Sequence, residues 1–246
     1  MKTLYCNGDS FVFGMECLGD HSRDEINKEF AFPAHVRTSL GCTTYINNAY
    51  NGATNDFIFR TTVADLIELE NSGSDPTDVF VLIGWTSLDR SAIDANPFPI
   101  TKTLNLTEEA VDHGIIFINP GFRANLTLPF DDGTVEIAKK IIPFLVNYIW
   151  TEPVLLPTHQ AQVACLEEFL KSKGYRYAFV STCGNYNNFK LLQNSTHWFR
   201  PLEKTFAQWA ISNHSWNLRA EHHFGTETHT EFGKLLVDYI TKNNLY

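Results

Sequence analysis

The 246-residue chain lacks the features that mark a membrane or secreted protein. Its apolar runs all stop short of the roughly 18 residues that a membrane-spanning helix needs. Its N-terminus has neither the apolar stretch nor the small-residue cleavage site of a signal peptide. These absences predict a cytoplasmic protein without a membrane partner, unless the protein leaves the cell on a larger particle such as a virion.

Motifs that hold metals, cofactors or disulfide bonds are also missing. The five cysteines are odd in number, scattered and without a Cys-x-x-Cys pair, which argues for reduced thiols and against a disulfide frame or a zinc knuckle. No His-Glu-x-x-His sequence occurs, and no glycine-rich nucleotide-binding loop follows the first apolar run. The sequence therefore predicts a protein that uses no metal and no cofactor.

Positive charge is in short supply. The chain has 19 Lys and Arg residues against 28 Asp and Glu residues, which gives a net charge of −9. Because a phosphate-binding protein usually displays a basic face, this balance disfavours nucleic acid as a partner. A small-molecule or carbohydrate substrate suits the charge better, and the composition carries no signal for an oligomeric state.

What the chain does have is the composition and patterning of a globular α/β protein. Hydrophobic residues make up 43% of it. Short apolar runs separated by helical patterns predict a three-layer, doubly wound, mostly parallel sheet of the flavodoxin-like type, in a single domain over residues 1–246. The expected strands are residues 3–7, 43–47, 79–84 and 175–181, with 113–119 as a candidate fifth.

The middle of the chain departs from this regular pattern. Proline and glycine residues break any long element between residues 91 and 135, which predicts an irregular insertion that walls or covers the site. Helices are expected to follow over about 135–150 and 158–173. A further helix is expected between the second and third strands, from an apolar pattern that runs from Ile58 to Leu69.

A serine stands directly behind the first expected strand, in the tripeptide Gly8-Asp9-Ser10. We therefore expect Ser10 on the turn that leaves this strand, where a serine can hold its hydroxyl beside free backbone N–H groups, as a nucleophile requires. The structural alternative is that Ser10 only caps a helix beginning near Phe11.

A histidine occupies a comparable position at the other end of the chain. An apolar stripe across residues 232–240 predicts a final amphipathic helix that starts near Thr226 to Thr228. Thr228 and Glu231 have the spacing of a capping box. His223 is thus expected in the loop just before the last helix.

A serine after the first strand and a histidine before the last helix resemble the SGNH, or GDSL-type, hydrolase superfamily, and small members found in tailed phages most of all. Residues 47–56 resemble the second block of this family, in which a glycine, here Gly52, donates its N–H to an oxyanion. Residues 81–87 fall where the third block is expected. The resemblance implies Ser10 as nucleophile, His223 as base, and the N–H groups of Ser10 and Gly52 as oxyanion donors.

The sequence departs from the family pattern at two functional positions. Thr86 stands where the third block has an asparagine, so the side-chain oxyanion donor is the Thr86 hydroxyl, comes from Asn51 or Asn55, or is missing. The family's Asp-x-x-His is also absent, because an alanine lies three residues before His223. Glu221, two residues before His223, is the carboxylate that the resemblance leaves to orient the ring.

Two further histidines compete with His223 for the role of base. His229 lies on the expected buried stripe and is the main alternative, and His222 is the second. We expect a serine esterase that cleaves a small acyl ester, such as an O-acetylated carbohydrate, through an acyl-enzyme. The rival hypotheses are a non-catalytic module that keeps the fold and binds a glycan or other ligand, and an acyltransferase that uses the same serine.

Overall fold

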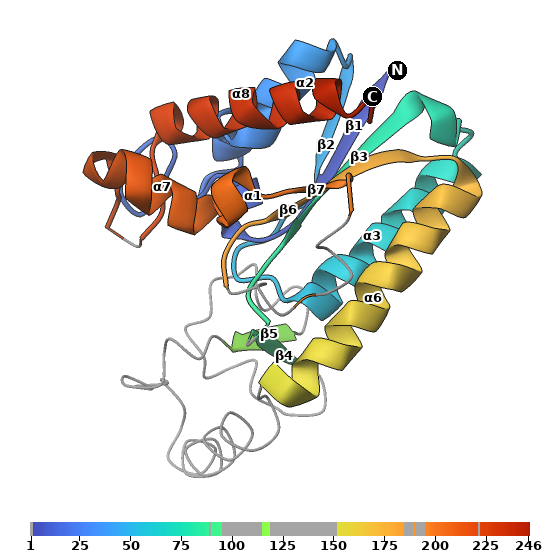
Figure 1. The fold of residues 1–246 in the computed structure, drawn as a ribbon, viewed down its shortest axis with the longest axis horizontal. Coiled ribbons are helices and arrows are strands. Elements are labelled where there is room, and N and C mark those ends of the chain that lie inside the picture. Colours follow the sequence, from blue (N-terminus) through green and yellow to red (C-terminus); the bar gives the residue numbers. More distant parts are fainter. Residues whose placement is uncertain are drawn as a thin grey trace.

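A five-stranded parallel sheet forms the centre of the protein (Figure 1). The computed structural model describes residues 2–88, 90–94, 115–118, 152–184, 189, 195–220 and 222–246. The strands lie in the order β2-β1-β3-β6-β7, with bounds β1 Thr3–Asn7, β2 Thr44–Asn47, β3 Val79–Trp85, β6 Arg176–Ser181 and β7 Trp198–Phe199. The predicted α/β class and mostly parallel, doubly wound sheet are confirmed.

Helices cover both faces of this sheet and make three layers (Figure 1). One face carries α3 (Asn55–Asn71) and α6 (Glu152–Lys173). The other carries α1 (Ser10–Phe13), α2 (Phe32–Leu40), α7 (Phe206–His214) and α8 (Thr226–Lys242). None of the helices in the described ranges is long and apolar enough to cross a membrane.

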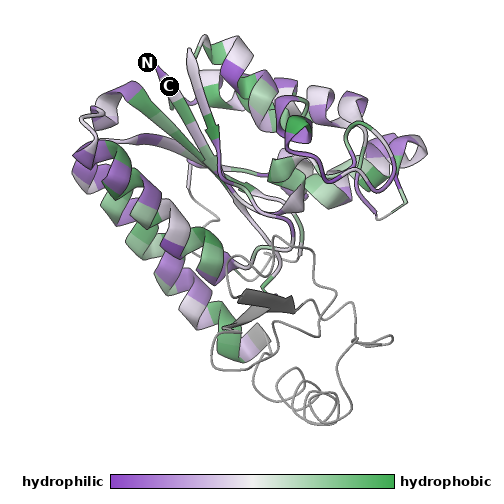
Figure 2. Ribbon diagram, turned by 180° about the vertical axis from the view of Figure 1, so that it is seen from behind, coloured by the Kyte–Doolittle hydropathy of each residue, from purple (hydrophilic) through white to green (hydrophobic). Residues whose placement is uncertain are grey.

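The alternation of side chains along the strands explains the two helical layers. Leu4 and Cys6 of β1 belong to the core beneath α2, α7 and α8, whereas Tyr5 between them belongs to the core beneath α3 and α6. Successive side chains of a strand point to opposite faces, so a strand buried on both sides is a continuous apolar run. Figure 2 shows this hydrophobic colour along the strands, with mixed colours on the helices.

The fifth strand of the sheet is not the one that the sequence predicted. The candidate run 113–119 contains β5 (Ile115–Ile118), which pairs antiparallel with β4 (Ser91–Asp94) in a separate two-stranded sheet. The fifth strand is β7, which has only two residues and is too short to show an alternating pattern. The rest of the predicted insertion at 91–135 and the predicted helix at 135–150 lie outside the described residues.

The last helix begins where the sequence predicted, but its capping box does not form. α8 starts at Thr226, and the residue that caps it is Gly225, without a side-chain hydrogen bond. The Thr228 hydroxyl instead accepts a hydrogen bond from Asn217 Nδ2 at 3.0 Å. Asn217 lies in the short helical turn before the loop, so tertiary contact outcompetes the local cap.

The order of the strands fixes where a ligand can bind. After β1 the chain passes to one neighbour, β2, and later returns to the other neighbour, β3. In doubly wound sheets this reversal opens a crevice at the carboxyl ends of the strands. Ser10 follows β1 and Thr86 follows β3, so both lie at this edge.

Close packing at the same edge makes Gly84→Ala a destabilising change. A Cβ on Gly84 would lie 2.2 Å from Val12 Cγ2 and 2.8 Å from Thr182 Cγ2. We expect overpacking to lower the free energy of unfolding by about 1–3 kcal/mol, measured by urea denaturation. Gly19→Ala is the matched control, because a Cβ at Gly19 meets nothing within 4 Å. Equal losses in the two variants would contradict this account.

Candidate active site

Ser10 is the first residue of a short helix that starts immediately after β1. Asp9 caps this helix, because its Oδ1 accepts a hydrogen bond from Phe11 N at 3.1 Å. Gly14 closes it in the left-handed conformation, with φ of 83°. The first N–H groups of a helix have no acceptor inside the helix. The Ser10 hydroxyl therefore lies beside a backbone N–H that is suited to bind an anion.

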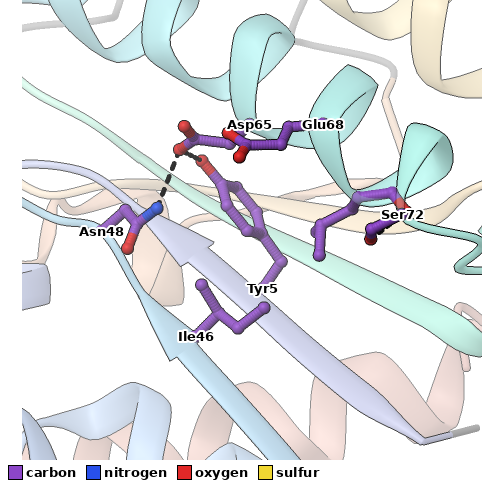
Figure 3. Close-up of a pocket in the computed structure, with 7 residues that line it drawn as sticks. Tyr5, Ile46, Asn48, Asp65, Glu68 and Ser72 are labelled. Atoms are coloured by element: carbon purple, nitrogen blue, oxygen red, sulfur yellow. Dashed lines mark hydrogen bonds between the residues drawn. The ribbon is translucent and has the colours of Figure 1, made fainter.

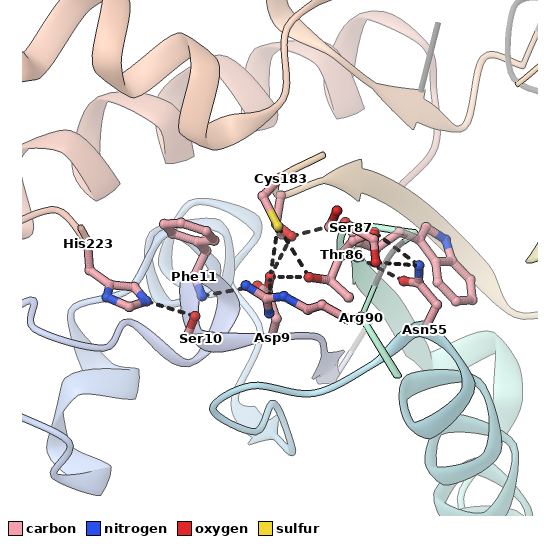
Figure 4. Close-up of polar contacts among 11 residues, drawn as sticks. Asp9, Ser10, Phe11, Asn55, Thr86, Ser87, Arg90, Cys183 and His223 are labelled. Atoms are coloured by element: carbon pink, nitrogen blue, oxygen red, sulfur yellow. Dashed lines mark hydrogen bonds and ion pairs between the residues drawn. The ribbon is translucent and has the colours of Figure 1, made fainter. Parts of the chain in front are cut away.

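The Ser10 hydroxyl contacts the imidazole of His223. Ser10 Oγ and His223 Nε2 lie 2.8 Å apart, although the two residues are 213 positions apart in the chain (Figure 4). A backbone bond from Arg219 N to His223 O, at 2.8 Å, holds the loop that carries the ring. The Phe11 ring packs against the imidazole with a centroid distance of 5.0 Å. Two segments predicted to carry a nucleophile and a base are thus brought together.

The other ring nitrogen of His223 faces a carboxylate that the sequence analysis did not identify. His223 Nδ1 lies 3.5 Å from Oε2 of Glu16, which is fully buried. Glu16 follows α1 and has a positive φ of 62°. The only sequence signal was a charged residue within the otherwise apolar run 11–18. No family motif places an acid there, which is why the residue was missed.

The remaining sequence candidates for base and acid lie elsewhere. His229 is fully buried, its Nδ1 accepts a hydrogen bond from Phe32 N at 3.2 Å, and burial lowers its pKa to about 3. These contacts make His229 a core histidine. His222 is exposed. Glu221 lies outside the described residues, so its assignment as the acid stays a prediction.

Burial sets the protonation state of His223. Removal from water is the largest influence and lowers the pKa of His223 below its usual value, and the positive charge of Arg90 lowers it too. The carboxylates of Asp9 and Glu16 act in the opposite direction and raise the pKa. A lowered pKa keeps the ring neutral near pH 7, as a general base requires.

Asp9 is the centre of a buried polar network beside Ser10 (Figure 4). Its Oδ2 accepts hydrogen bonds from Thr86 Oγ1 at 2.7 Å and Thr182 Oγ1 at 2.9 Å, and lies 3.3 Å from Arg90 Nη1. The carboxylate thereby joins the loops that follow β1, β3 and β6. The network fixes the direction of the turn on which Ser10 lies.

The side chains expected to assist an oxyanion take part in this scaffold. Thr86 donates its hydroxyl proton to Asp9, and Asn55 Nδ2 donates to Thr86 O at 3.0 Å while its Oδ1 accepts from Thr86 N at 2.9 Å. An oxyanion role for either side chain stays a prediction and would require these bonds to rearrange. Gly52, with φ of 80°, lies in a loop that a Tyr50 N to Gly8 O bond of 3.0 Å ties to the serine turn.

A separate pocket lies between the β2 edge of the sheet and α3 (Figure 3). It has a volume of about 230 Å³ and is lined by Tyr5, Ile46, Asn48, Asp65, Glu68, Leu69 and Ser72. Tyr5 donates its hydroxyl proton to Asp65 Oδ2 at 2.6 Å, and burial raises the Tyr5 pKa well above its usual value. This pocket holds no nucleophile with a neighbouring base, so the chemistry belongs to Ser10 and His223. Among the described residues, no group of three His, Cys, Asp or Glu side chains could hold a metal ion.

Fold and site together define an α/β protein with a serine–histidine pair at the carboxyl edge of a parallel sheet. No model of a protein family matches the sequence, and a search among curated proteins finds no match. Comparison with solved structures does find similar proteins. The fold is that of the SGNH, or GDSL-type, hydrolases.

Three of these solved structures describe the likeness. A carbohydrate esterase has a TM-score of 0.50 and 13% identity, over 98% of this chain and 65% of its own. The esterase EstA from a Pseudoalteromonas species has a TM-score of 0.49 and 13% identity, over 98% of each chain. A protein described as lipolytic, of the G-D-S-L family from Desulfitobacterium hafniense, has a TM-score of 0.43 and 13% identity, over 97% of this chain and 99% of its own. At such identities the likeness establishes the fold, and the special similarity to phage proteins stays a prediction.

Proposed function

We propose that this protein is a serine ester hydrolase in which Ser10 is the nucleophile and His223 the general base. The observation that carries the proposal is the 2.8 Å contact between Ser10 Oγ and His223 Nε2. A serine hydroxyl is a weak nucleophile until a neighbouring base accepts its proton, and this distance lies within the range for that transfer.

The reaction proceeds in two halves at the same atoms. Ser10 Oγ attacks the ester carbonyl carbon while His223 Nε2 takes the hydroxyl proton, and the ring then delivers this proton to the leaving alcohol. Water, deprotonated by the same nitrogen, releases the acid from the acyl-enzyme. The backbone N–H groups of Ser10 and Gly52 stabilise the oxyanion, and each such donor typically lowers the barrier by about 3 kcal/mol.

For the substrate we propose a small acyl ester, with an O-acetylated carbohydrate as the leading class. Support comes from the fold shared with a carbohydrate esterase and from the net charge of −9, which suits a neutral ligand. Neither nucleic acid nor a cofactor is part of the proposal.

Covalent labelling with a fluorophosphonate tests the proposal. We expect one phosphonyl group on Ser10, detected by mass spectrometry of peptides, because the reagent reports a serine activated by a base. Ser10→Ala should abolish the adduct, while Ser39→Ala, which removes an exposed serine of α2, should leave it unchanged. Folded protein without an adduct would sink the hydrolase and favour the non-catalytic binding module.

A further inference from the structure

The acid that faces His223 comes from a different part of the fold than the family pattern requires. In the pattern the acid precedes the histidine by three residues on the same loop, and here an alanine stands there. Glu16 instead approaches from the segment that follows α1, six residues after Ser10. Its Oε2 lies 3.5 Å from His223 Nδ1, on the side of the ring opposite Ser10.

We propose that Glu16 is the positioning residue for His223, so that one continuous segment supplies both the nucleophile and the acid. The inference rests on the proposed function of Ser10 and His223. In this arrangement Nδ1 keeps its proton and points it at Glu16, which leaves Nε2 free to accept the proton of Ser10. When the ring becomes an imidazolium, the carboxylate lies where it stabilises the new charge.

The segment around Glu16 is built to hold this carboxylate in place. Glu16 Oε1 accepts a hydrogen bond from His21 N at 2.7 Å, and Glu16 N donates to Ser22 O at 2.8 Å. Fully buried Asn27 braces the same loop, because its Nδ2 donates to Ser22 Oγ at 2.9 Å and its Oδ1 accepts from Leu18 N at 3.1 Å. These bonds anchor one carboxylate oxygen and leave Oε2 turned towards the imidazole.

The backbone conformation of Glu16 points to the same role. A glutamate with φ of 62° is in the left-handed region, which residues other than glycine seldom adopt. Such strained positions persist where the surrounding structure enforces them, and they gather at functional sites. Combined with the contact to His223, the strain identifies Glu16 as a placed group rather than a buried charge left over from packing.

The charged and titratable groups that act on His223 are few. Asp9 lies on the Ser10 side, Glu16 lies at Nδ1, and Arg90 approaches through Asp9. His229 lies deeper in the core and is neutral, with its pKa lowered to about 3. Of the two carboxylates, Asp9 is already held by two hydroxyls and Arg90. Glu16 is therefore the carboxylate that can respond to the charge on the ring.

Glu16→Gln separates this role from a merely structural one. On a small ester such as p-nitrophenyl acetate we expect kcat to fall by about 10³-fold with little change in KM, since an amide in this place disturbs the tautomer and no longer stabilises the imidazolium. The Glu16 carboxylate raises the pKa of His223, so its removal should lower that pKa further. The acid limb of the pH–rate profile should then shift to lower pH, which a structural defect alone would not produce.

Three variants act as comparisons. Glu16→Asp keeps the charge and should recover part of the lost kcat. Glu221→Gln tests the acid implied by the family resemblance and should cost less than Glu16→Gln. Glu25→Gln, at an exposed site, should leave kcat at the wild-type value. A larger loss with Glu221→Gln, or an unmoved acid limb with Glu16→Gln, would overturn the proposal.

A readout without turnover keeps this inference distinct from the proposed function. In the Ser10→Ala background, the His223 imidazole can be titrated by NMR with Glu16 or with Gln at that position. We expect a lower His223 pKa with Gln, whether or not the wild-type protein hydrolyses esters. An unchanged pKa would overturn the Glu16 assignment even if Ser10 is labelled, and a failure of labelling alone would overturn the hydrolase.

Discussion

His223→Ala is expected to lower kcat/KM for a small acyl ester by about 10⁴-fold or more. The imidazole is the group in contact with Ser10 Oγ, at 2.8 Å, and without it the hydroxyl has no base to take its proton. The residual rate would come from the oxyanion donors and from substrate binding alone. Initial rates on p-nitrophenyl acetate, with the folded state checked by circular dichroism, measure the effect.

The neighbouring histidine provides the matched control. His222 is exposed and adjacent in sequence, and His222→Ala should retain near wild-type kcat/KM. If His222→Ala were as inactive as His223→Ala, or if His223→Ala stayed active, the assignment of the base would be wrong.

Asp9→Ala is expected to give the largest loss of stability, about 3–5 kcal/mol in the free energy of unfolding. The Asp9 side chain is fully buried and accepts from Phe11 N, Thr86 and Thr182 as well as pairing with Arg90. Its removal takes the acceptor from two buried hydroxyls and the counter-charge from a mostly buried guanidinium, so each of these groups bears its desolvation cost.

Urea denaturation of Asp9→Ala and of a surface variant measures this difference. Asp20 is exposed, and Asp20→Ala should change the free energy of unfolding by no more than about 0.5 kcal/mol. Asp9→Asn should also be clearly destabilised, because an amide nitrogen cannot accept the hydrogen bonds that the lost oxygen accepted. A loss in Asp9→Ala as small as that in Asp20→Ala would show that the network contributes little.

Most of the sheet and its helices could be predicted because their signals are local. β1 was predicted at its observed bounds, and the predicted starts and ends of β2, β3 and β6 differ from the structure by a single residue. Buried parallel strands are continuous apolar runs, and surface helices repeat their apolar residues every three to four positions, so both patterns can be read within one segment. β7 escaped prediction because two residues cannot show a period.

By itself, the sequence determined the α/β class, the position of Ser10 at the end of β1 and the position of His223 before α8. Only the tertiary structure decided which atoms meet. The 2.8 Å contact between Ser10 and His223 spans 213 residues, and it depends on how α8 and its preceding loop pack on the sheet. Glu16 has no sequence signature as an acid, because its role comes from the folded loop that turns its carboxylate towards the ring. Local periodicity dictates elements, whereas long-range packing dictates the distances between reactive groups.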